Sequence, residues 1–189
     1  AGYPDGKGFG TVNLRYNLGE INSFVADEFA QQIGQILGIN VNIDGSTFEQ
    51  LNQDAAQGNG DIFRSAWSAD YPNPDNFLHL FYSKNITDLS NNNLGINNSK
   101  YLNPTFDALL EDARKQENIG QKMKLYAKAE RELLKNPPII PLWYSGDMQI
   151  IYSNVRNLHL NSLNYFDFTK VYLKNWTEEE YQTELAKKK

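Results

Sequence analysis

The sequence has no cysteine and only two histidines, His79 and His159. Without cysteine, the chain forms no disulfide and offers neither a thiolate nucleophile nor a cysteine-ligated zinc site. The patterns H-E-x-x-H, G-x-S-x-G and the aspartate-rich calcium loop are also absent. We therefore expect no metal, no cofactor and no enzymatic activity. A glycosidase pair, for which Asp70 and Asp75 are the best-placed carboxylates, is the enzymatic alternative.

Long apolar runs and excess positive charge are absent as well. No stretch of about eighteen apolar residues occurs, so we expect no membrane contact by this part of the protein. The formal net charge of −5 argues against a nucleic-acid partner. The 189 residues are enough for a domain with a hydrophobic core.

The most informative stretch runs from Asp61 to Tyr82. Alternating side chains predict a strand over Asp61–Trp67, because successive strand residues point to opposite faces. Pro72 and Pro74 end that strand, and Asn73 is a natural cap for a short helix. The apolar face of this helix is predicted to contain Phe77, Leu78 and Phe81.

Two charged residues lie where a ligand would bind this predicted strand. Ligands of open α/β sheets bind outside the carboxyl ends of the strands. Arg64 lies within the strand and Asp70 follows its end. The structural alternatives are that Asp70 caps a turn and that Arg64 forms an ion pair with a nearby carboxylate.

The first part of the chain alternates strand and helix patterns. Strands are predicted at Thr11–Asn17 and 39–43, and a helix capped by Asn22 or Ser23 is predicted between them. Strand, helix and strand at this spacing favour a right-handed βαβ unit with a parallel pair. A second helix follows, capped by Ser46 or Thr47, and it directs Phe48, Leu51 and Ala55 inward. These patterns predict an α/β fold.

The second part is read as a polar surface loop, two helices and a β-rich segment. The segments are a surface loop at 83–103, an antiparallel helix pair that starts at Asn103-Pro104 and at Ile119, strand-like runs at 139–144 and 148–152, shorter β pieces over 155–173, and a terminal helix over 177–188.

Several motifs resemble one known family. Trp67-Ser68-Ala69-Asp70-Tyr71-Pro72 followed by Phe77-Leu78 matches the signature W-x-A-D-Y-x-x-P-x-x-F-L of oligopeptide- and dipeptide-binding proteins, the extracytoplasmic solute-binding subunits of peptide ABC importers. Weaker matches are Ala1-Gly2-Tyr3-Pro4, the segment 12–17, the segment 125–130 and the segment 140–144. The resemblance extends over about 1–173.

The resemblance implies a fold class and a division of the chain. The fold would be α/β, the C-terminal lobe of a two-lobed type II periplasmic-binding-protein fold. Residues 1–144 would form the ligand-binding lobe, 145–173 the hinge crossover and strands that return to the other lobe, and 174–189 a C-terminal helical tail. The signal and the N-terminal lobe are expected to lie outside this chain.

The resemblance also implies a function. The protein would capture oligopeptides between two lobes for an ABC importer, with the permease as partner, in the periplasm or as a cell-surface lipoprotein. Asp70 would pair with the peptide α-ammonium group, and Arg64 with its carboxylate. The remaining expected ligand-binding residues are Ser65, Ala66, Trp67, Ser68 and Tyr71, and Trp143 and Tyr144 are weaker candidates. Alternatives are a peptide or pheromone sensor of the same fold, a family member that binds an oligosaccharide or metal complex, and a structural α/β module.

Overall fold

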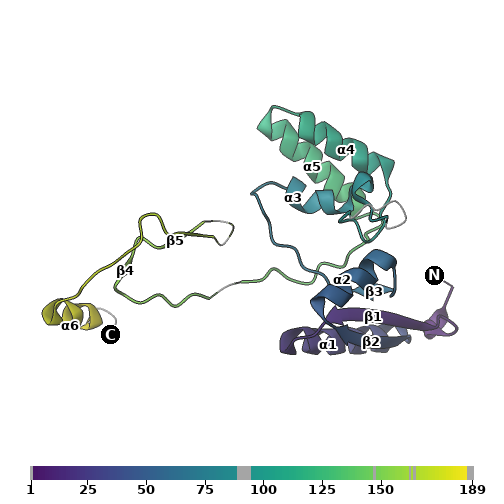
Figure 1. The fold of residues 1–189 in the computed structure, drawn as a ribbon. Helices are drawn as coiled ribbons and strands as arrows, with labels where there is room; N and C mark the ends of the chain where they lie inside the picture. Colours follow the sequence, from purple (N-terminus) through teal and green to yellow (C-terminus); the bar gives the residue numbers. More distant parts are fainter. Residues whose placement is uncertain (1, 89–94, 147, 162, 164, 187–189) are drawn as a thin grey trace. The chain divides into compact units, whose positions relative to one another are not determined.

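A computed structural model describes residues 2–88, 95–146, 148–161, 163 and 165–186 (Figure 1). The described chain divides into two compact units. Unit 1 contains Ala1–Trp67 and Asn73–Pro138, and unit 2 contains Ser68–Pro72 and Ile139–Lys189. Each unit is described by itself below.

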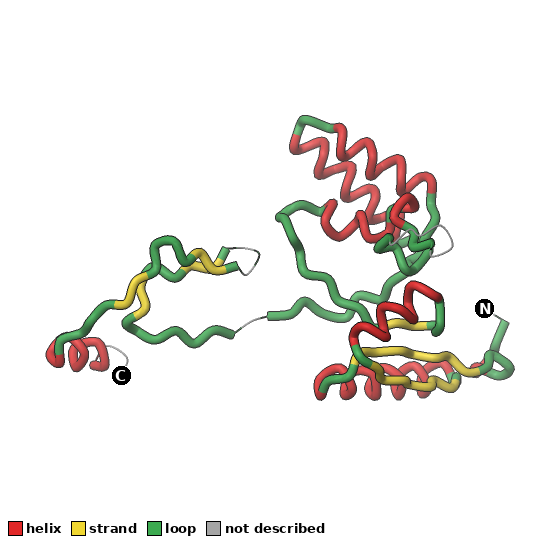
Figure 2. Tube along the Cα trace, in the orientation of Figure 1, coloured by secondary structure: helices red, strands yellow, loops and turns green. Residues whose placement is uncertain are grey.

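Unit 1 begins with a short parallel sheet, shown by the yellow strands near the N-terminus in Figure 2. Its strands, in spatial order, are β2 (Asn40–Ser46), β1 (Thr11–Asn17) and β3 (Ile62–Phe63). β1 pairs in parallel with both neighbours, in a register that sets Leu14 opposite Ile43 and Ile62. The predicted parallel pair and its crossover helix are thereby confirmed.

Two helices, α1 (Glu20–Leu37) and α2 (Phe48–Gln57), pack against this sheet. Thr47 caps α2 as predicted, because its Oγ1 accepts a hydrogen bond from the backbone N–H of Gln50 at 3.2 Å. The predicted cap of α1 at Asn22 or Ser23 is wrong, since the helix follows Gly19 and no side chain caps it. The Ser23 N–H instead donates to the Gly19 carbonyl, so the first helical turn begins earlier.

The core of this part is small. Leu14, Tyr16 and Ala26 form its buried cluster, against which Phe29, Val41, Ile43 and Ile62 pack. Leu51 and Ala55 of α2 are buried, as predicted. Phe77, which was expected on the apolar face of the short helix after β3, is 46% exposed. Ile21 (73%) and Leu37 (52%) on α1 and Phe48 (64%) on α2 have the spacing of core residues and are exposed as well. A three-stranded sheet whose third strand has two residues covers only part of each helix, so amphipathic spacing alone overestimated the core.

The second core of unit 1 is helical. It comprises α3 (Asp75–Leu78), a 3-10 helix (His79–Phe81), α4 (Pro104–Lys115) and α5 (Ile119–Leu133). The predicted helix pair is confirmed, since α4 and α5 pack side by side in opposite directions (Figure 1). Phe106, Leu110, Ala113 and Ala129 are fully buried between them. Side-chain oxygens of Asn103 and Asn118 accept backbone N–H groups at the starts of α4 and α5.

The polar segment 83–103 differs from the predicted surface loop. Thr87 and Asn97 are buried, with 4% and 1% of their surface exposed. The Asn97 Nδ2 donates to the carbonyl oxygens of Tyr82 at 3.2 Å and Tyr101 at 3.0 Å. Hydrogen bonds from a buried amide to backbone carbonyls hold this segment in place of apolar packing. Hydropathy alone does not reveal such a polar core, which is why the segment was predicted to be a surface loop. The Asn91-Asn92-Asn93 run lies outside the described residues.

Unit 2 contains two small antiparallel ladders and one helix. β4 (Val155–Arg156) pairs with β7 (Tyr172–Leu173), and β5 (His159–Leu160) pairs with β6 (Phe166–Asp167). α6 spans Glu178–Ala186, and its start is capped by Thr177, whose Oγ1 accepts from the Glu180 N–H at 3.3 Å. The predicted strand-like runs at 139–144 and 148–152 are wrong, because the described residues there pair with no strand. Pro141 lacks the amide donor that a ladder needs.

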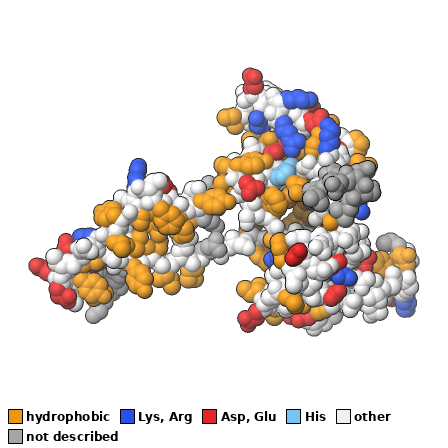
Figure 3. All heavy atoms as spheres, in the orientation of Figure 1, with side chains coloured by type: hydrophobic (Ala, Val, Ile, Leu, Met, Phe, Trp, Pro, Cys, Tyr) orange, Lys and Arg blue, Asp and Glu red, His pale blue; other side chains and the backbone are white. Residues whose placement is uncertain are grey.

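Unit 2 exposes many large apolar side chains, which appear in orange in Figure 3. The most exposed are Tyr144 (100%), Ile150 (94%), Met148 (90%) and Tyr152 (83%). A soluble protein seldom leaves so many large apolar side chains in water on one short segment.

Glu111 on α4 holds the start of the segment 83–103 by hydrogen bonds to Tyr82 and Lys84. Glu111 accepts hydrogen bonds from the Tyr82 hydroxyl and, at 2.9 Å, from Lys84 Nζ. These hydrogen bonds, that of Lys84 foremost, lower the pKa of Glu111 to about 2, whereas that of an ordinary glutamate is 4.5. A carboxyl whose pKa is lowered by folding stabilises the fold above its unfolded pKa and loses that contribution as the pH falls through the folded value.

Replacing Glu111 by Gln should therefore lower stability most at neutral pH. The difference in the free energy of unfolding between wild type and Glu111→Gln should narrow as the pH falls from 4.5 to about 2. In that range the Glu111 carboxylate of the wild type becomes protonated and loses its charge. Urea unfolding followed by circular dichroism, repeated across this range, measures the gap. Glu117→Gln, at an exposed position, is the matched control. A gap that does not change with pH would contradict the role given to Glu111.

Candidate functional site

Arg64 lies one residue past the end of β3. The predicted strand over 61–67 is shorter than expected: β3 ends at Phe63, which lies opposite Arg15 of β1. The backbone N–H of Arg64 donates to the Arg15 carbonyl at 2.8 Å. Its Nη1 donates to the Asn17 Oδ1 at 3.1 Å. The amide oxygen of Asn17 is neutral, so this contact orients the guanidinium group without compensating its charge.

Arg15 on β1 forms two ion pairs close to this position in the sheet. Its Nη1 lies 2.8 Å from the Asp54 Oδ2 and 3.2 Å from the Asp44 Oδ2. The Asp54 side chain is 6% exposed and that of Asp44 is 50% exposed. Gln50 donates a further hydrogen bond to Asp54 at 3.1 Å. The ion pair therefore connects the central strand to α2. Sequence reasoning missed it, although a charged residue inside a predicted strand was the available signal.

Ser65, Ala66 and Trp67 continue the chain with exposed side chains. The Trp67 ring is 41% exposed, and its Nε1 donates to the Asn76 Oδ1 at 2.7 Å. Asn76 itself is fully buried. The ring of His79 meets Trp67 edge-on, with centroids 5.9 Å apart and an angle of 75° between the planes. Trp67 is thus fixed at its polar edge while part of its surface faces solvent.

Ser68, Asp70 and Tyr71 belong to the segment that groups with unit 2. All three are exposed, Tyr71 by 41%. The Asp70 carboxylate is therefore not turned into a core. Trp143 and Tyr144, the two weaker candidates in the same unit, are 53% and 100% exposed.

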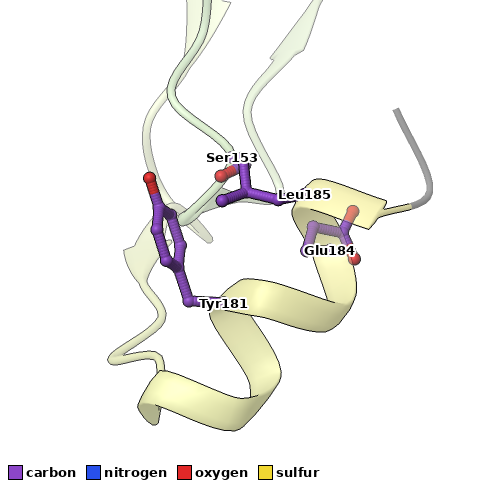
Figure 4. A pocket seen from close by; sticks show the side chains of 4 residues that line it. All are labelled: Ser153, Tyr181, Glu184 and Leu185. Carbon is purple, nitrogen blue, oxygen red and sulfur yellow. The ribbon is translucent and has the colours of Figure 1, made fainter. Parts of the chain in front are cut away.

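The described part of the chain offers little for other chemistry. It contains no group of three or more His, Cys, Asp or Glu side chains that could hold a metal ion. None of its helices is long and apolar enough to cross a membrane. A small hollow in unit 2 is lined by Ser153, Tyr181, Glu184 and Leu185 (Figure 4), none of which belongs to the motif around Asp70.

Comparison with protein families gives one match to this chain. Residues 1–88 match the family described as bacterial extracellular solute-binding proteins, family 5 Middle. The matched segment contains Arg64, Trp67 and Asp70 with the whole of the sequence signature around them.

Curated relatives extend this match toward the C-terminus. The periplasmic oligopeptide-binding protein OppA of Salmonella typhimurium is 33% identical over 141 residues, which cover 75% of this chain and 24% of that protein. OppA of Escherichia coli is 30% identical over 151 residues, which cover 80% of this chain and 26% of that protein. The chain therefore spans about a quarter of the length of these relatives.

Solved structures agree with the fold. The periplasmic binding protein DppA of Helicobacter pylori, in complex with the peptide STSA, is 26% identical and matches with a TM-score of 0.70 over 92% of this chain and 32% of that one. Periplasmic peptide-binding proteins of the two-lobed type II fold are thus the structural neighbours of this chain, and the predicted fold class is confirmed.

Loss of the Asp54 carboxylate should destabilise unit 1 strongly. Asp54→Asn removes the buried partner of Arg15, and a charged hydrogen bond of this kind contributes about 2 kcal/mol. Asp44→Asn removes the exposed partner and should cost less than about 1 kcal/mol. Urea unfolding at neutral pH measures both values. Equal losses for the two variants would show that burial of Asp54 does not decide the strength of the pair.

Proposed function

Because residues 1–88 of this chain belong to family 5 of the bacterial extracellular solute-binding proteins, we propose that the chain is one lobe of an extracytoplasmic substrate-binding component of an ABC importer, and that the complete protein captures oligopeptides between two lobes. One observation carries the proposal. The full W-x-A-D-Y-x-x-P-x-x-F-L signature lies in a segment that aligns with periplasmic oligopeptide-binding proteins at 30% identity or more.

Charge at the two ends of the peptide is the first element of recognition. A peptide is a zwitterion, and a receptor for many sequences must hold the parts that all peptides share. Asp70 is exposed, and its carboxylate is suited to the α-ammonium group through a charge-assisted hydrogen bond. Arg64 is oriented by the neutral Asn17, so its guanidinium group keeps a charge with which to bind the peptide carboxylate in a bidentate manner.

Backbone pairing is the second element. The chain leaves its sheet partner after Phe63, and the next residues have exposed side chains. Ser65, Ala66, Trp67 and Ser68 would pair their backbone groups with the peptide, as an added strand does in other peptide receptors. The rings of Trp67 and Tyr71 would form walls around it. Such contacts do not depend on the peptide's side chains, which is what an importer of varied peptides needs.

The chain would supply one of two lobes, which close on the ligand about a hinge. In this proposal residues 1–144 form the ligand-binding lobe, 145–173 return through the hinge to the other lobe, and 174–189 form a helical tail. The exposed apolar side chains of Met148, Ile150 and Tyr152 support a partner surface for 145–173 on the other lobe. The complete protein would deliver peptide to a membrane permease, from the periplasm or as a lipoprotein, and it would not be an enzyme.

Asp70→Asn should weaken the binding of peptides with a free amino terminus by about 10- to 100-fold, because a charged hydrogen bond is lost. N-acetylated peptides, which lack the ammonium group, should bind wild type and variant alike. Titration calorimetry on the complete two-lobed protein measures both affinities. Asp27→Asn, which removes the same charge from an exposed position on α1, is the control. Equal losses for free and acetylated peptides would remove Asp70 from the amine role.

The 189 residues by themselves should bind peptide weakly or not at all, since only one side of the ligand would be covered. Calorimetry with tri- to pentapeptides should give no dissociation constant below about 100 µM, against the micromolar or tighter binding that two closed lobes allow. Micromolar affinity for this chain alone would contradict the two-lobed mechanism.

A further inference from the structure

The hydrogen bond between Trp67 and Asn76 closes the loop that carries Asp70. The two residues lie nine positions apart, and the Trp67 Nε1 donates to the Asn76 Oδ1 at 2.7 Å. Both residues belong to unit 1. The loop that they close, residues 68–75, contains Asp70 and Tyr71.

Each end of this loop is fixed to a different element. On the N-terminal side, Arg64 is bonded to β1 through the Arg15 carbonyl at 2.8 Å. On the C-terminal side, the Asp75 carboxylate lies 2.7 Å from the Nε of Arg114 on α4, which anchors the start of α3. The Asn73 Oδ1 accepts the Asp75 N–H at 2.9 Å and shapes the turn before that helix.

Asn76 is buried, and this burial fixes the position of its side-chain oxygen. Its side chain has no exposed area, whereas the Trp67 ring is 41% exposed. An amide without exposed area cannot exchange its partner for water at little cost, so the acceptor position is fixed. The indole, in contrast, can only donate a hydrogen bond, so the position of its acceptor, the Asn76 Oδ1, determines how the ring is oriented.

His79 restricts the same ring from a second direction. Its ring meets Trp67 edge-on at 5.9 Å between centroids. The Nδ1 of His79 lies 2.8 Å from the Asp75 carbonyl oxygen, and since a carbonyl only accepts, Nδ1 carries a proton. The imidazole is thereby held at the start of the 3-10 helix that follows α3.

We propose that Asn76 is a positioning residue for peptide binding: it holds the Trp67 indole in place and closes the base of the Asp70 loop before any ligand arrives. This inference rests on the proposed function, because it assigns Asp70 and Trp67 to the peptide. Ordering a loop in advance removes an entropic cost that the ligand would otherwise meet. Asn76 acts through Trp67 and does not itself touch the peptide.

The first experiment tests the contact without peptide. In a chain with Trp143→Phe and Trp176→Phe, Trp67 is the sole tryptophan. Asn76→Leu keeps the size of the side chain but removes the acceptor. Time-resolved fluorescence anisotropy should then show a larger amplitude of fast indole motion than in the parent chain. An unchanged amplitude would overturn the proposal, whether or not the protein binds peptide.

The second experiment tests the consequence for binding in the complete two-lobed protein. Asn76→Leu should lower the affinity for a tripeptide with a free amino terminus by about 3- to 10-fold, the range expected for the loss of one neutral hydrogen bond. In a Trp67→Phe background, which lacks the indole donor, Asn76→Leu should cause no further loss. The same loss in both backgrounds would show that Asn76 acts only through overall stability, and would overturn the proposal.

A matched control separates positioning from folding. Asn97 is another buried asparagine of unit 1, and it bonds to the carbonyls of Tyr82 and Tyr101 and not to Trp67. Asn97→Leu should lower the unfolding temperature and leave the Trp67 anisotropy unchanged. A wild-type protein that binds no peptide would refute the proposed function, and the anisotropy measurement would still decide the role of Asn76.

Discussion

The buried ion pair between Arg15 and Asp54 is the interaction on which the sheet region depends. Arg15 lies on the central strand, and Asp54 reaches it from α2 at 2.8 Å. An ion taken out of water must be paired, so the position of α2 is coupled to that of β1. The carbonyl of the same Arg15 accepts the backbone N–H of Arg64, which begins the proposed ligand-binding segment. The proposed carboxylate-binding residue is therefore hydrogen-bonded directly to the strand residue that pairs with Asp54.

Polar side chains perform a second structural task in the helical core. Asn76 and Asn97 are buried, and each forms a hydrogen bond that holds an irregular segment: Asn76 accepts from the Trp67 indole, and Asn97 donates to the carbonyls of Tyr82 and Tyr101. Such amides fix a loop in one conformation, whereas apolar contacts allow it to slide. The chain uses Asn97 to hold the polar segment 83–103 and Asn76 to hold the segment that carries Asp70. A loop whose ends are fixed and whose central residues are exposed loses little conformational entropy when it binds a ligand.

The second unit has little strand pairing and few buried apolar side chains among its described residues. Its ladders contain two residue pairs each, which is too little pairing for independent stability. Its large apolar side chains are exposed at Tyr144, Met148 and Ile150. The division between a well-packed first unit and an open second one is consistent with a chain that spans about a quarter of the length of its relatives.

Local pattern and motif were enough to predict most elements of unit 1. The parallel pair, the Thr47 cap and the α4–α5 pair follow from alternation, capping chemistry and short connections, which are properties of neighbouring residues. The same reasoning misjudged the extent of burial. Ile21 and Phe48 have the spacing of core residues and are exposed, because spacing does not report how much sheet there is to cover them.

The sequence by itself determined the fold class and the motif that places Asp70, Arg64 and Trp67 in one short segment. Only the tertiary structure decided where β3 ends, that Arg64 bonds to Asn17, and that Trp67 bonds to Asn76. The physical reason is the same in each case. A strand extends only as far as its backbone groups pair with a neighbouring strand, and a polar side chain bonds to whatever partner folding brings near it. Both outcomes therefore depend on contacts that the local sequence pattern does not contain.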